Sequence, residues 1–71
     1  MALMNQEFVE RLEGIQEQLG SLYGDLEALR ADLKAGGHKS DAQALNEPLE
    51  RLGRYGRLFS DMLGAWTEPQ E

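Results

Sequence analysis

Large apolar residues recur along the first half of the chain at alternating steps of four and three. They form one unbroken series: Phe8, Leu12, Ile15, Leu19, Leu22, Leu26, Leu29 and Leu33. This spacing gathers all eight side chains along one side of an α-helix, whereas a strand would show apolar residues at every second position. The pattern therefore predicts a helix over about residues 6–35, with an apolar seam that must pack against another element.

A second amphipathic helix is expected to follow a glycine turn. Gly36 and Gly37 end the first helix, because glycine takes the left-handed conformation beyond a helix C-terminus without a Cβ clash. The turn is predicted over residues 36–40, and a Ser-x-x-Gln capping box that begins at Ser40 indicates a helix over about residues 41–65. Its seam has the same period as the first and consists of Leu45, Leu49, Leu52, Phe59 and Leu63. The sequence thus predicts an all-α, antiparallel two-helix hairpin.

Pro48 interrupts this second helix, because proline lacks an amide hydrogen and crowds the preceding turn. Two outcomes are open at this stage. Residues 41–46 form a separate short turn with Asn46 capping the main helix, or the helix continues with a kink near 46–48. The polar end of the chain, residues 67–71, is predicted to be a disordered tail.

Length and charge narrow the classes of function. The 71 residues allow one small domain, over residues 1–66, and contain no cysteine for a disulfide or a thiolate metal site. The net charge of −6 opposes broad contact with nucleic acid or with an anionic membrane surface. The sequence has neither a long apolar segment nor the pattern of a signal peptide, so we expect a cytoplasmic chain.

Few residues of this sequence suggest catalysis or ligand binding, and we expect no enzymatic activity, small-molecule substrate, cofactor or metal. His38 stands alone in the glycine turn and is interpreted as a loop residue. The acidic residues of the first helix are interpreted as a solvated face that compensates the helix dipole: Glu7, Glu10, Glu13 and Glu17. A basic stripe on the second helix, Arg51, Arg54 and Arg57, is expected to form ion pairs with the first helix near Glu17, Asp25 and Glu27.

The second helix carries more apolar surface than one neighbouring helix can cover. Four residues beside its seam are predicted to bind a partner: Tyr55, Leu58, Met62 and Trp66. Tyrosine, tryptophan and methionine are enriched in protein interfaces. The alternative is that these residues form the core of a self-associated dimer. In both cases another chain is expected to complete the fold.

The chain also resembles a known family, the small E-class co-chaperones of bacterial type III secretion. The resemblance rests on a leucine-rich first helix with Leu29 and Asp32 before the pair Gly36-Gly37, on Gln43 early in the second helix, and on Leu52 within that helix.

This resemblance implies a non-enzymatic helical hairpin in the bacterial cytosol. Such a hairpin pairs with a larger helical-repeat chaperone, and together they hold the needle subunit before export. The alternative function is a small self-dimerising regulator or inhibitor, of bacterial or phage origin, that masks a site on another protein.

Overall fold

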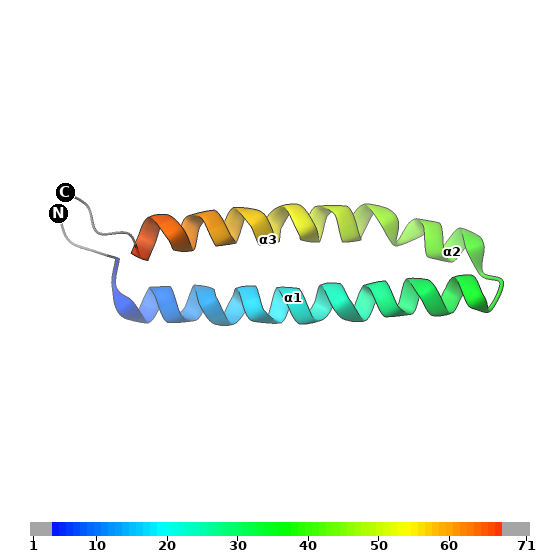
Figure 1. Ribbon diagram of the computed structural model, residues 1–71, viewed down its shortest axis with the longest axis horizontal. Helices are drawn as coiled ribbons and strands as arrows, with labels where there is room; N and C mark the ends of the chain where they lie inside the picture. Colours follow the sequence, from blue (N-terminus) through cyan, green and yellow to red (C-terminus); the bar gives the residue numbers. More distant parts are fainter. Residues whose placement is uncertain (1–3, 68–71) are drawn as a thin grey trace.

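In a computed structural model, which describes residues 4–67, the chain forms an antiparallel helical hairpin (Figure 1). Helix α1 spans Gln6–Ala35 and makes one arm. Helices α2 (Lys39–Ala44) and α3 (Asn46–Thr67) return along it as the second arm. The predicted all-α hairpin is therefore confirmed.

Local signals set both ends of α1. The Asn5 side chain accepts a hydrogen bond of 2.8 Å from the backbone N–H of Glu7, as an N-cap residue does. At the other end, Gly37 has a φ of +84°, a conformation that a residue with a Cβ rarely adopts. This turn lets the N–H of His38 donate to the carbonyl of Leu33 at 2.8 Å, which satisfies one free carbonyl of the last turn.

The second arm begins earlier than the sequence pattern indicates. Helix α2 begins at Lys39 and not near residue 41, and its N-cap is His38, which makes no side-chain cap hydrogen bond. The expected capping box at Ser40 is therefore not formed, because that residue already lies inside the helix.

The arm then breaks into two helices. The break lies at Leu45, where the N–H turns to the carbonyl of Ala42 at 3.2 Å in a tightened turn. Pro48 consequently falls in the first turn of α3, where its missing N–H costs little. Of the two open outcomes, the structure has the split arm, but Asn46 is the first residue of α3 and not its cap, and its side chain accepts from Arg30 instead. Helix α3 continues to Thr67, so the predicted disordered tail over residues 67–71 is wrong at Thr67, and residues 68–71 lie outside the described residues.

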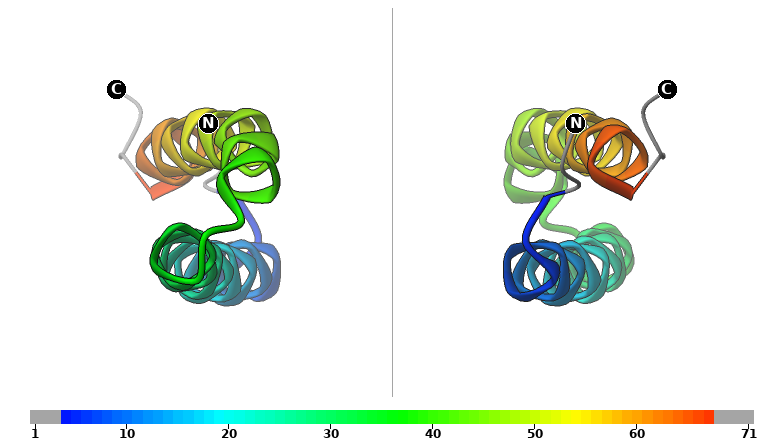
Figure 2. Two further views of the ribbon diagram at one scale, coloured as in Figure 1. Left: turned by 90° about the vertical axis from the view of Figure 1, so that its right-hand side faces the viewer. Right: turned by 90° about the vertical axis from the view of Figure 1, so that its left-hand side faces the viewer.

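The hairpin is long and thin. It measures 55 × 16 × 11 Å and has a radius of gyration of 16.4 Å, whereas a globular chain of this length has about 11 Å. Views along its length show one helical arm above the other (Figure 2). Among the described residues, only Val9, Leu12, Ala42 and Leu49 are buried, and Leu12 is still 8% exposed. A single pair of helical arms thus leaves much apolar surface exposed.

The row on α1 that meets the second arm differs from the predicted seam. Its least exposed residues are Val9, Leu12, Gln16, Leu19, Tyr23, Leu26, Arg30 and Leu33. Leucines 12, 19, 26 and 33 belong to both rows. The other four members of the predicted seam lie beside the contact and are 47–49% exposed: Phe8, Ile15, Leu22 and Leu29. For these four the seam assignment is wrong.

The physical reason lies on the facing helix. A methyl group at Gly53 would lie 3.6 Å from Cε2 of Tyr23, so this aromatic ring packs where α3 has no side chain. Gln16 donates through Nε2 to the carbonyl of Gly56 at 3.4 Å. Because α3 offers room and polar partners at these levels, α1 turns its longer and more polar residues toward it. In the second arm the expected seam residues are buried or half-buried: Leu45, Leu49, Leu52, Phe59 and Leu63.

Candidate interaction surface

The residues of each arm that face the other arm are here called the contact row. They separate two exposed faces of the hairpin, which differ in the side chains that they carry. Residues directly after a contact residue, such as Gly20 on α1 and Gly53 and Ser60 on α3, line one common hollow. At 3.6 residues per turn, a residue directly before a contact residue projects from the opposite flank. Ile15 and Tyr55 occupy such positions. The residues before the contact row of both helices therefore share the second face.

This second face is apolar along most of the hairpin. Its half-exposed members, which we name the apolar face, are Phe8, Ile15, Leu22, Leu29, Tyr55 and Leu58. The four residues of α1 follow one another at seven-residue intervals, and the two of α3 are 46% and 52% exposed. Aligned large apolar side chains of this kind mark interaction sites, whereas single scattered ones do not.

The structure divides the four residues that the sequence predicts to bind a partner. Tyr55 and Leu58 are exposed members of the apolar face. Met62 directly precedes the contact residue Leu63, so it lies on the same face but is half-buried, and Trp66 is also half-buried, in the contact row. The assignment of all four to partner binding stays a prediction.

Sequence reasoning missed the larger part of this surface, the four residues on α1. It assigned them to the internal seam because they alternate with leucines at helical spacing. A usable signal existed, since Val9 and Tyr23 also lie at three- and four-residue steps from the same leucines. Helix α1 therefore carries two overlapping apolar rows, and one helix can meet only one of them.

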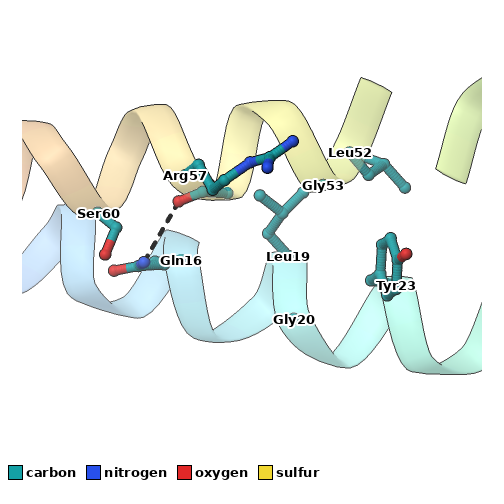
Figure 3. Close-up of a pocket in the computed structure, with 9 residues that line it drawn as sticks. Gln16, Leu19, Gly20, Tyr23, Leu52, Gly53, Arg57 and Ser60 are labelled. Atoms are coloured by element: carbon teal, nitrogen blue, oxygen red, sulfur yellow. Dashed lines mark hydrogen bonds between the residues drawn. The ribbon is translucent and has the colours of Figure 1, made fainter. Parts of the chain in front are cut away.

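The opposite face contains the hollow, here called the glycine groove (Figure 3). Its volume is about 370 Å³, and it is lined by Gln16, Leu19, Gly20, Tyr23, Leu52, Gly53, Gly56, Arg57 and Ser60. The groove exists because three of these residues are glycines, so the helices lack side chains to fill the middle of the hairpin. Leu19 lies close to Gly56: a methyl group added at Gly56 would lie 3.6 Å from Cδ2 of Leu19.

The arginines of α3 pair along their own helix. Arg51 lies 2.6 Å from Glu47, and Arg54 lies 3.6 Å from Glu50, both at i,i+4 spacing with largely exposed side chains. Arg57 lines the glycine groove. For Arg51 and Arg54 the expected ion pairs with α1 are therefore replaced by intrahelical ones, because neighbouring turns of one helix bring the charged groups together without crossing the hairpin. Exposed pairs of this kind contribute little to stability.

Other chemistry is limited in the part of the chain that the structure describes. Within residues 4–67, no group of three histidine, cysteine, aspartate or glutamate side chains is placed to hold a metal ion. No helix within the same residues has the length and apolar character that crossing a membrane requires. The arginine of α1 that lies in the contact row, Arg30, donates to Oδ1 of Asn46 at 2.8 Å and thus ties the two arms together.

No protein family, curated protein or solved structure matches this chain.

Proposed function

We propose that this chain is a non-enzymatic protein-interaction module whose apolar face packs against helices of another protein. The observation that carries the proposal is the alignment of Phe8, Ile15, Leu22 and Leu29 on α1, each about half exposed, beside Tyr55 and Leu58 on α3. Removing such surface from water contributes about 25 cal/mol per Å², and within residues 4–67 no layer of the hairpin covers it.

The shape of the face indicates a helical partner. A straight stripe with one large apolar residue every seven positions matches the periodicity of an amphipathic helix laid alongside it. The chain's net charge of −6 favours a partner that is neutral or basic near the contact. Nucleic acids and anionic membranes are disfavoured by the same charge.

In its specific form, the proposal is that of a cytoplasmic co-chaperone. The chain pairs with a helical-repeat chaperone, and the two together hold a type III secretion needle subunit before export. The sequence resemblance supports this form, and so does the thin hairpin, because a partner that binds only the folded chain also stabilises it. Half-buried Met62 and Trp66 extend the contact at the open end of the hairpin.

The test compares two adjacent substitutions on α1, Leu29→Glu and Ala28→Glu. Both place the same charge on the same helix, but position 29 lies in the apolar face and position 28 lies on the exposed outer side. Tagged variants are co-expressed with the helical-repeat chaperone and the needle subunit of the same secretion system. Complexes are then measured by size-exclusion chromatography with light scattering.

We expect the complex to form with Ala28→Glu and to be lost with Leu29→Glu, because an unpaired charge in a desolvated contact costs several kcal/mol. Circular dichroism of the free variants verifies that both remain helical. Equal binding by the two variants would refute a role for the apolar face. Absence of any complex with the unmodified chain would refute the co-chaperone form.

A further inference from the structure

The apolar face has a size that suits a defined occupant. Its six side chains are each about half exposed, so together they offer on the order of 500 Å² of apolar area. This is about a tenth of the 5550 Å² that the whole chain exposes. Two such faces in contact would remove on the order of 1,000 Å² from water, which is where specific interfaces begin.

The apolar face is also complementary to the same face of a second copy of the chain. Contacts such as that between Leu19 and Gly56 fix which residues of the two arms lie at the same level. In this register Ile15 is about level with Met62, and Leu22 with Tyr55. These two levels therefore each present one apolar side chain from each arm. A copy rotated by 180° places the same paired side chains opposite, which extends these two levels to four apolar residues each, as in a four-helix bundle.

The charged residues at the borders of the apolar face are also complementary between two copies related by this 180° rotation. On the α1 border Asp25 is exposed, and about level with it on the α3 border lies Arg51, which is also exposed. A two-fold axis along the hairpin lays α1 of one copy over α3 of the other. Each Asp25 then lies opposite Arg51 of the second copy. The guanidinium group of Arg51, bound on one side by Glu47, has further donors for this carboxylate. Such rim pairs set orientation more than affinity.

From this size, match and charge pattern we propose that the free chain is a homodimer, in which two apolar faces pack about a two-fold axis along the hairpins. The inference rests on the proposed function, because it names what covers the interaction face before a partner chain binds. The partner then displaces the second copy, and the same residues serve both contacts.

The first test measures mass in solution by sedimentation equilibrium. The unmodified chain, Leu22→Glu and Ser21→Glu are compared from about 1 to about 200 µM, a range in which mass action reveals a dimer. Position 21 is exposed on the outer side and serves as the matched control. We expect dimers for the unmodified chain and Ser21→Glu, and a dissociation constant at least ~30-fold higher for Leu22→Glu. A monomeric unmodified chain, or an unchanged dimer in Leu22→Glu, overturns the inference.

The second test determines the orientation. Because the chain has no cysteine, the single variants Asp25→Cys and Arg51→Cys each carry one thiol. A short bismaleimide should give a product of double mass when the two variants are mixed, and little product with either variant alone. No enrichment in the mixture would overturn the lengthwise two-fold axis.

Salt dependence separates a second copy from a foreign partner. Two chains of charge −6 repel at long range, and salt screens this repulsion while the apolar contact persists. Dimerisation should therefore strengthen as salt is raised, and weakening would contradict an apolar contact between copies. If the unmodified chain is monomeric yet binds the chaperone through Leu29, the homodimer is refuted and the proposed function stands.

Discussion

Two leucines of α3 allow the effect of burial on stability to be measured while the residue type and the helix stay the same. Leu49 is 2% exposed and faces α1, whereas Leu58 is 52% exposed on the apolar face. Replacing either by alanine removes the same atoms from the same helix and changes helix propensity by the same small amount. The difference between the two effects therefore reports the packing of each site.

We expect Leu49→Ala to reduce the free energy of unfolding by about 2 to 5 kcal/mol, the range for a buried leucine. For Leu58→Ala about half of the side chain is already in water, so the expected loss is about 1 kcal/mol or less in the monomer. A chain of this size has only a few kcal/mol of stability in total. Leu49→Ala should therefore lose a large part of that stability, and its urea midpoint should fall well below that of Leu58→Ala.

The assay is urea denaturation followed by circular dichroism, with both substitutions placed in the Leu22→Glu background so that dimerisation does not contribute. If the unfolding free energies of the two variants differ by less than about 1 kcal/mol, Leu49 is not in a packed core. The register in which α3 packs against α1 would then be wrong. A larger effect at Leu58 than at Leu49 would reverse the assignment of the two faces.

Two further predictions concern glycines. Gly24→Ala should raise the free energy of unfolding by up to about 1 kcal/mol, because alanine favours the helix and its Cβ would meet nothing within 4 Å; an unchanged or lower melting temperature would contradict the exposed helical position. Gly37→Ala should lower stability by about 1 kcal/mol or more, because its φ of +84° strains any residue with a Cβ; thermal unfolding of the two variants side by side measures both, and a neutral Gly37→Ala would mean that the turn relaxes to another conformation.

The turn and the helix bounds depend on short-range chemistry, and for that reason the sequence indicates them well. Asn5, placed before the first periodic residues, accepts the cap hydrogen bond, and the glycine pair supplies the left-handed residue that ends α1. The start of the second arm is less well indicated. Ser40 has the right neighbours for a cap, but the turn that Gly37 permits already brings the chain into helix at Lys39.

The sequence pattern predicts the α3 part of the apolar face but not the α1 part. The pattern on α3 indicates that its apolar arc is wider than one neighbouring helix can cover, and Tyr55 and Leu58 are exposed in the structure. It gives no reason to place Leu22 or Leu29 outside the seam, because each has the spacing and the hydrophobicity of a seam residue. Choosing between two rows that share the same leucines requires knowledge of the helix that faces them.

By itself, the sequence determined that the chain forms two helical arms with a turn at Gly36 and Gly37, since period, caps and glycines act over a few residues. Only the tertiary structure decided the rotation of α1 about its own axis. That rotation depends on what α3 presents: the bare backbone at Gly53 receives Tyr23, and Asn46 accepts a hydrogen bond from Arg30. These contacts turn the mixed row inward, and the wholly apolar stripe that begins at Phe8 is left facing outward.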